Sequence, residues 1–184
     1  MSIKSLAITG YKPHELNIFS DKDDKVTIIK ESLKRRLTNL LEEGLEWVVV
    51  SGQQGVETWA FDVVQELKGS FHVKIALIPP FIDQEKIWNE DKQTVYQRLI
   101  EQADFYQPLS NKTYENPKQY FIKNKWMIEK TDACLLLYEE EFGGSPKYFY
   151  ELVLKYQEKF HYDMIIINSF DLDDLARDMQ EWNE

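Results

Sequence analysis

Short, continuous apolar runs alternate along the chain with longer segments in which apolar residues recur every three to four positions. Continuous runs are typical of strands covered on both faces of a sheet, and the longer spacing is typical of amphipathic helices. The pattern predicts strands at residues 6–8, 47–50, 73–78, 105–109, 133–138 and 164–167. It predicts helices at about residues 25–43, 55–68, 84–103, 117–130, 146–159 and 172–182.

Alternation of strand and helix throughout predicts right-handed βαβ connections and a doubly wound, mostly parallel sheet with helices on both faces. This is a three-layer, Rossmann-like α/β architecture. The 184 residues suit a single domain spanning 1–184, since no repeat or linker-like stretch divides them. The longest polar connection, residues 108–117, is expected to be a plain surface loop, with a mobile lid as the alternative.

Charge and composition narrow the class of partner. The chain has 22 Lys and Arg residues against 32 Asp and Glu residues, a formal net charge of −10. Binding a nucleic-acid backbone requires a net basic face, so the negative net charge argues against a nucleic-acid partner. It leaves open a small basic site for one nucleotide. The 14% of aromatic residues excludes a disordered acidic chain.

Cys134 is the single cysteine, so the chain has no intramolecular disulfide and no multi-cysteine metal site. It lies in an apolar run and is expected to be buried. No stretch approaches the roughly 18 apolar residues of a membrane span, and the first residues lead directly into a strand-like run. We therefore expect a protein of a reducing compartment, most simply the bacterial cytoplasm, with no membrane partner.

Ligands of open parallel sheets bind beyond the carboxyl ends of the strands, and three segments of the chain fall there. The first segment contains Thr9, Gly10, Lys12 and His14. Gly10 allows a close backbone approach, and Lys12 and His14 suit a phosphate or carboxylate. The alternative is a tight turn with Lys12 and His14 in solvent.

The second segment joins the second strand to the next helix through Ser51, Gly52, Gln53 and Gly55. Free N–H groups and the positive end of the helix dipole predict an anion site there. The turn lacks the ending of a Walker loop and the full Rossmann fingerprint. Glu57, in the first helical turn, is expected to complement the dipole, to hold a ribose hydroxyl or to serve as a base.

The third segment contains Gly143, Gly144 and Ser145 and precedes another helix. Ser145 is expected to be the N-cap, and Pro146 suits the first turn. Two helix N-termini at one crevice suit a phosphate or diphosphate. The acidic run at residues 139–141 would repel such a group and is expected to point away from it or to face the ribose.

Large aromatic side chains are mostly core residues, and this is the expectation for Trp59, Trp88, Trp126 and Phe142. One aromatic ring can instead stack on a base. Trp88 and Phe81, near the end of the third strand, are the first candidates for that contact.

Several motifs together resemble one known family over nearly the whole chain. They are Ala7-Ile8-Thr9-Gly10-Tyr11-Lys12-Pro13, Glu43-Gly44-Leu45-Glu46-Trp47, Ser51-Gly52-Gln53, Gly55-Val56-Glu57 and Gly144-Ser145-Pro146-Lys147-Tyr148. The chain resembles the YpsA family of small bacterial proteins, part of the SLOG superfamily of Rossmann-like domains, which includes DprA and the LOG phosphoribohydrolases. The resemblance implies a nucleotide-related ligand, often proposed to be ADP-ribose or another NAD derivative. It also implies regulation of cell division in Gram-positive bacteria, with cell-division proteins as partners.

Comparison with the LOG enzymes of the same superfamily adds two candidate ligand-binding residues and shows where this chain lacks the catalytic residue of those enzymes. Lys123 and Asn124, followed by Met127 and Asp132, resemble a motif of the LOG enzymes, with Lys123 in place of arginine. A lysine cannot bind a phosphate through two parallel hydrogen bonds as arginine does. Where those enzymes carry the catalytic glutamate, this chain has Tyr148. Both changes weaken the expectation of N-glycosidic hydrolysis. Asp132 is expected to accept from a backbone N–H group.

These features predict a regulatory protein that holds a nucleotide-like ligand on the turns at 52–55 and 143–145, with Lys12 and Lys123 as charge partners and Glu57 on the ribose. The enzymatic alternative is a phosphoribohydrolase-type hydrolase with Glu57 as acid or base. A third alternative is a protein-interaction module. No cofactor beyond a nucleotide or an ADP-ribose-like ligand and no metal site is expected, and an oligomer is an open alternative.

Overall fold

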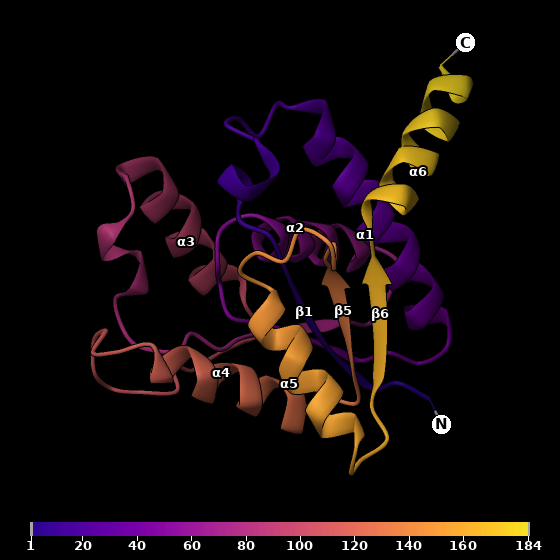
Figure 1. The fold of residues 1–184 in the computed structure, drawn as a ribbon. Coiled ribbons are helices and arrows are strands. Elements are labelled where there is room, and N and C mark those ends of the chain that lie inside the picture. Colours follow the sequence, from indigo (N-terminus) through magenta and orange to yellow (C-terminus); the bar gives the residue numbers. More distant parts are fainter. Residues whose placement is uncertain (1, 184) are drawn as a thin grey trace.

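The strands form a single parallel sheet in a computed structural model that describes residues 2–183 (Figure 1). They are β1 (Ser5–Gly10), β2 (Trp47–Val50), β3 (Lys74–Leu77), β4 (Phe105–Tyr106), β5 (Ala133–Leu137) and β6 (Asp163–Ile167). Their order across the sheet is β4-β3-β2-β1-β5-β6, and every neighbouring pair is parallel. The predicted doubly wound α/β class is confirmed.

Helices cover both faces of the sheet. They are α1 (Asp24–Glu42), α2 (Val56–Leu67), α3 (Glu90–Gln102), α4 (Lys118–Glu129), α5 (Lys147–Gln157) and α6 (Ser169–Trp182), with short 3-10 helices η1 (Pro13–Leu16) and η2 (Gln84–Ile87). Helix α1 packs on α2 and α6, and α4 packs on α5. In Figure 1, α4 and α5 lie in front of the strands, and α1 and α2 lie behind them.

The central strands are buried on both faces, which explains their continuous apolar sequences. All five residues of β5 are buried, and so are the last five residues of β1. Cys134 lies within β5, and its predicted burial is confirmed. Burial raises the pKa of the Cys134 thiol to about 12, so the thiol stays protonated at neutral pH. No helix in the described residues is long and apolar enough to cross a bilayer.

Three predicted boundaries were wrong, each for a local reason. The predicted helix at 84–103 is interrupted: η2 ends at Ile87, and α3 starts anew because the Asn89 side chain accepts from the backbone N–H of Lys92. The predicted strand at 105–109 shortens to two residues in β4. The last helix begins earlier than residue 172, at Ser169, because Asn168 forms a reciprocal capping box.

The loop at residues 108–117 is fastened to its surroundings by backbone hydrogen bonds. The N–H of Leu109 donates to the carbonyl of Pro79, and the N–H of Ile82 donates to the carbonyl of Lys112. The Gln119 side chain accepts from the backbone N–H groups of Glu115 and Asn116. The loop therefore lies across the end of β3, where its Tyr114 ring approaches Phe81 at 5.5 Å between ring centroids.

The strand order reverses next to β1, and this positions the site. The connection from β1 to β2 runs through α1 on one face, whereas the connection from β5 to β6 runs through α5 on the other. Loops therefore diverge at the carboxyl ends of β1 and β5, where Gly10 pairs with Leu137. Ligands of such sheets bind at this switch point.

Candidate functional site

A cavity of about 580 Å³, here called the main cavity, opens at the switch point between α4 and α5. The predicted site residues that line it are Thr9, Gly10, Lys12, Gln53, Glu57, Lys123, Asn124 and Ser145. They come from the ends of β1 and β2, the first turn of α2, the middle of α4 and the segment before α5, so the fold gathers residues far apart in the sequence. Ser51, Gly52, Gly55, Gly143 and Gly144 do not line this cavity.

Glu57 is the most constrained polar group at the site. Its side chain is buried, with its residue only 2% exposed. One carboxylate oxygen accepts from the backbone N–H of Ser51 at 2.6 Å and from the Ser51 hydroxyl at 2.9 Å. The other accepts from the Thr9 hydroxyl at 3.1 Å. Glu57 thus ties the end of β2 and the end of β1 to the first turn of α2.

These bonds bear on the roles expected of Glu57. A carboxylate has about four lone-pair positions, and three donor groups of the chain already occupy part of this capacity. Each donor would lose its partner if Glu57 turned towards a ligand, at the free-energy cost of a buried unsatisfied group. The geometry therefore favours Glu57 as the residue that positions Ser51 and Thr9.

Lys12 and Lys123 supply positive charge to the main cavity. Lys123 is half-buried, and its ammonium group has no hydrogen-bond or ion-pair partner within residues 2–183. Burial lowers the pKa of Lys123, and the charge of Lys12 lowers it further, whereas Glu57 acts in the opposite direction. An unpaired ammonium group in this position is well suited to a ligand that brings a negative charge.

Asn124 has an unpaired polar atom beside Lys123. The residue is 8% exposed, and its Oδ1 atom is buried without a hydrogen-bond partner in the described part of the chain. A buried acceptor left unpaired costs free energy, and a bound water or ligand is one kind of partner that satisfies such a group in native structures. Asn124 lines the main cavity, so a rotation of its amide group would bring Oδ1 within reach of a ligand hydroxyl or amine.

The segment just before α5 already binds an anion that the chain itself provides. The carboxylate of Glu15 accepts from the Ser145 N–H at 2.9 Å and from the Ser145 hydroxyl at 2.6 Å. It also accepts from the Lys12 N–H at 2.9 Å. The prediction that Ser145 caps the helix was wrong: its hydroxyl donates to Glu15, and α5 begins after Pro146 without a side-chain cap.

The glycines of the turns allow close packing of the chain itself. Gly55 has φ +91°, and a Cβ atom there would collide with the carbonyl oxygen of Tyr11. Gly52 has φ +86°, and its Cβ would lie 2.7 Å from the Tyr96 ring. A Cβ on Gly10 would meet the Val56 side chain at 2.8 Å. These positions require glycine before any ligand is considered.

The two glycines of the 143–145 turn differ in how tightly the surrounding chain packs against them. Gly144 has φ +83°, and its Cβ would lie 2.7 Å from the Tyr11 ring, so it too is constrained by packing. Gly143 has φ +73°, where a Cβ would make only an ordinary contact with the Lys147 side chain at 3.9 Å, and its carbonyl accepts from the Tyr11 hydroxyl at 2.7 Å. Tyr11 thereby fixes the 143–145 turn beside the end of β1.

A second cavity of about 400 Å³ adjoins the first, and we call it the aromatic cavity. Its aromatic lining consists of Phe81, Trp88, Tyr114 and Tyr120. Phe81 and Trp88 were the sequence candidates for stacking. Tyr114 and Tyr120 were missed, because a loop residue and a helix residue carry no joint signal until the fold brings them to Phe81.

The remaining aromatic predictions had mixed outcomes. Trp59 is buried in the core as expected, whereas Trp88 and Trp126 are half-buried. Phe142 is 60% exposed, so the expectation that it lies in the core was wrong. Its ring packs edge-on against Tyr11 at 5.5 Å on the outside of the 143–145 turn.

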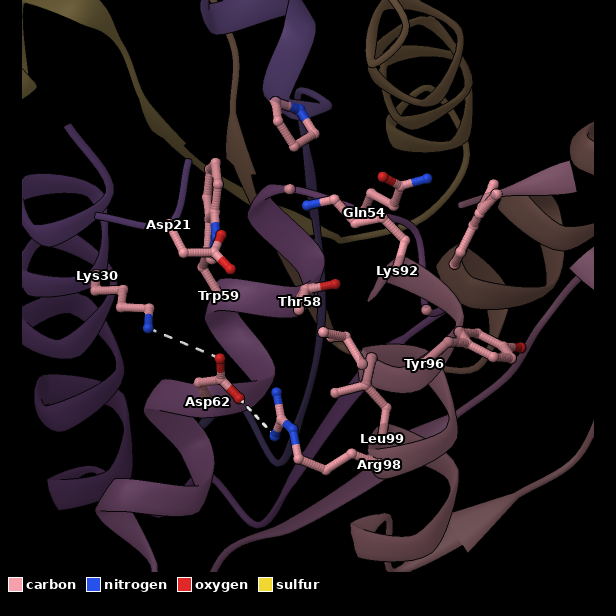
Figure 2. A pocket seen from close by; sticks show the side chains of 15 residues that line it. Asp21, Lys30, Gln54, Thr58, Trp59, Asp62, Lys92, Tyr96, Arg98 and Leu99 are labelled. Atoms are coloured by element: carbon pink, nitrogen blue, oxygen red, sulfur yellow. Dashed lines mark hydrogen bonds and ion pairs between the residues drawn. The ribbon is translucent and has the colours of Figure 1, made fainter. Parts of the chain in front are cut away.

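A small cavity of about 90 Å³ lies behind the 52–55 turn, between α2 and α3 (Figure 2). Asp62 lies between two basic side chains there, with Arg98 at 2.9 Å and Lys30 at 3.7 Å. Figure 2 shows both contacts, which join α1, α2 and α3. Because these charges pair with one another, the arrangement indicates helix packing, not a ligand site.

Two acidic residues have structural partners. Asp132 accepts from the backbone N–H groups of Lys4 at 2.8 Å and Ser5 at 3.1 Å, which confirms its predicted role. Glu139 accepts from the N–H and hydroxyl of Ser169 at the start of α6, so it points away from the main cavity.

Among residues 2–183, no group of three His, Cys, Asp or Glu side chains is arranged to hold a metal ion.

Comparison with known proteins identifies the family of the chain. Residues 6–172 match the sequence profile described as the YspA SLOG family, YpsA. A UPF0398 protein of Lysinibacillus sphaericus is 50% identical over 175 residues, covering 95% of this chain and 98% of the relative. A UPF0398 protein of Oceanobacillus iheyensis is 45% identical, covering 97% of this chain and 96% of the relative. A UPF0398 protein of Bacillus thuringiensis is 43% identical, covering 98% of both chains. The chain therefore belongs to the YpsA family of SLOG proteins.

Proposed function

We propose that the protein binds a nucleotide-derived ligand in the main cavity. Its phosphate lies against Lys12 and Lys123, and a ribose hydroxyl donates to Asn124. The observation that carries this proposal is the pair of adjacent, unpartnered groups on α4: the Lys123 ammonium and the Asn124 Oδ1 atom. An anion and a hydroxyl close together on one ligand satisfy both groups, and a sugar phosphate has this chemistry.

Location and charge support the same ligand class. The cavity lies at the switch point of a doubly wound sheet, where such folds bind nucleotides. Two lysines are enough for a small anion, whereas the formal net charge of −10 disfavours a polyanion. Membership of the SLOG group is consistent with a nucleotide-related ligand.

For its cellular role we propose ligand-dependent regulation, with cell division in Gram-positive bacteria as the process that the family resemblance implies. The hydrolase alternative, with Glu57 as acid or base, receives less support, because the Glu57 carboxylate is bound by Ser51 and Thr9. In a Gram-positive host, a folded Lys123→Met protein is expected to lose the effect that the wild-type protein has on cell division. If the variant keeps the wild-type effect on cell division, the regulatory role does not depend on ligand binding.

Isothermal titration calorimetry tests the binding itself. The wild-type protein is titrated with AMP, NAD and ADP-ribose, next to Lys123→Met and Lys125→Met. Lys125 is an exposed lysine on the same helix that pairs with Glu129 at 3.9 Å. We expect saturable binding of at least one ligand, weakened roughly tenfold or more by Lys123→Met and unchanged by Lys125→Met. No heat from any ligand, with folded protein, would overturn the proposal.

A further inference from the structure

The aromatic cavity has a wall built from three separate segments. Phe81 follows β3, Tyr114 lies in the loop before α4, and Tyr120 lies in α4 itself. Their rings contact one another, with centroid separations of 5.5 Å for Phe81 and Tyr114, 5.6 Å for Phe81 and Tyr120, and 6.0 Å for Tyr114 and Tyr120. Trp88 lines the same cavity from the end of η2. The fold thus concentrates four aromatic rings around one opening.

Two of these rings keep much of their surface open. Phe81 is buried beneath the others, whereas Tyr114 is 52% exposed and Tyr120 is 38% exposed. Apolar ring surface left open at the wall of a concave site is typical of a place where a ligand packs. The loop that carries Tyr114 is fixed at the carbonyl of Lys112, which accepts from the N–H of Ile82.

The aromatic cavity borders the main cavity. Lys12, Gln53 and Tyr120 line both of them. Lys12 therefore stands at the border of the two cavities and can reach a phosphate on the main-cavity side. In a nucleotide the ribose lies between the phosphate and the base, so a phosphate on Lys123 and Lys12 in the main cavity places the ribose towards the border and the base beyond it.

The aromatic side chains that line this cavity favour a ligand that contains a flat ring. Aromatic side chains stack on the faces of any base, and this attraction tolerates differences at the base edges. His14 and Asp83 line the same cavity and offer polar groups to such an edge. Resting on the nucleotide-binding function proposed above, we infer that the aromatic cavity of Phe81, Trp88, Tyr114 and Tyr120 is the subsite for the base of the ligand.

The test compares a probe that has a base with one that has none. Calorimetry measures the affinities of AMP and ribose 5-phosphate for the wild-type protein and for Tyr114→Ala. Stacking on one aromatic side chain contributes roughly a tenfold to hundredfold gain in affinity. We expect wild type to bind AMP more tightly than ribose 5-phosphate, and Tyr114→Ala to lose about tenfold or more for AMP alone.

Two controls accompany the measurement. Tyr114→Phe keeps the ring and is expected to retain the affinity of wild type for AMP. Phe170→Ala removes a more exposed ring on α6, which lines neither cavity, and is expected to change neither affinity. Circular dichroism confirms that each variant is folded.

The outcomes separate the subsite from the function on which it rests. If wild type binds AMP and ribose 5-phosphate equally well, or Tyr114→Ala weakens both probes by the same factor, the base subsite is overturned while phosphate binding stands. An unchanged affinity of Tyr114→Ala for AMP also overturns it. If wild type binds neither these probes nor NAD and ADP-ribose, both proposals fall.

Discussion

The carboxylate of Glu15 accepts hydrogen bonds from both the backbone N–H and the hydroxyl of Ser145, at 2.9 Å and 2.6 Å. These residues are 130 positions apart, and their contact joins η1 to the start of α5. The Glu15 carboxylate thus occupies the N–H and hydroxyl of Ser145, the residue before the N-cap of α5, where the helix dipole also favours a negative charge. A ligand phosphate is therefore expected at Lys12 and Lys123, and not on the 143–145 turn.

The contact between Glu15 and Ser145 predicts a dependence of stability on pH. Burial alone would raise the pKa of Glu15, but the hydrogen bonds from Ser145 and Lys12 and the charge of Lys12 outweigh burial and lower it. A carboxyl group with a lowered folded-state pKa stabilises the fold above its ordinary pKa, and this contribution disappears as the pH falls through the folded-state value.

Glu15→Gln removes that titration. We expect the variant to be less stable than wild type at neutral pH and to lose less stability between about pH 5 and pH 3, because the Gln side chain does not titrate. Urea unfolding at a series of pH values measures this. The control is Glu151→Gln, which alters an exposed carboxylate whose ion pair is with Lys147 at 3.8 Å. Parallel pH profiles for wild type and Glu15→Gln would contradict the assigned contact.

Glu57→Gln tests the positioning role of Glu57. The amide replaces one carboxylate oxygen with an N–H donor that faces the donors of Ser51 or Thr9. We expect the free energy of unfolding to fall by about 2 kcal/mol and the Tm by about 4–8 °C. Thermal unfolding followed by circular dichroism measures the shift. A variant as stable as wild type would show that Glu57 is free to serve a ligand or a reaction.

Lys123→Met is expected to separate stability from binding. The substitution removes an ammonium group that has no partner in residues 2–183, so the Tm of the free protein should stay equal or rise. Ligand affinity should fall, as proposed above. Differential scanning calorimetry of Lys123→Met and Lys125→Met gives the comparison. A clear loss of stability in Lys123→Met would mean that the ammonium group has a structural partner.

The two glycine turns should differ in their tolerance of a side chain. Gly55→Ala places a Cβ against the Tyr11 carbonyl at φ +91° and should cost more than about 2 kcal/mol. Gly143→Ala makes only an ordinary contact with the Lys147 side chain at φ +73° and should cost only about 1 kcal/mol. Chemical unfolding ranks the two variants. Equal losses would refute the packing role assigned to Gly55.

Periodicity was enough to predict the fold class, because buried parallel strands and amphipathic helices leave different spacings of apolar residues. The prediction of helix ends was wrong where one side chain determines the end. Asn89 is an example, because its side chain caps a new helix after η2. The position of each turn relative to the sheet was predictable in the same way, since strand ends are visible in the apolar runs.

Much of the site depends on contacts that no local pattern encodes. Lys123 and Asn124 were identified through a family resemblance, and only the fold shows that both lack partners. The role of Glu15 appears only when η1 meets the start of α5. Tyr114 and Tyr120 become one surface because the loop before α4 crosses the end of β3.

A crystal structure of the protein with AMP bound tests the central claim most directly, because it locates phosphate, ribose and base at once. We expect the phosphate within hydrogen-bond distance of Lys12 and Lys123, a ribose hydroxyl on the Asn124 side-chain amide, and the base against Tyr114 and Tyr120. A phosphate bound on the 143–145 turn, or a main cavity empty at saturating AMP, would contradict it.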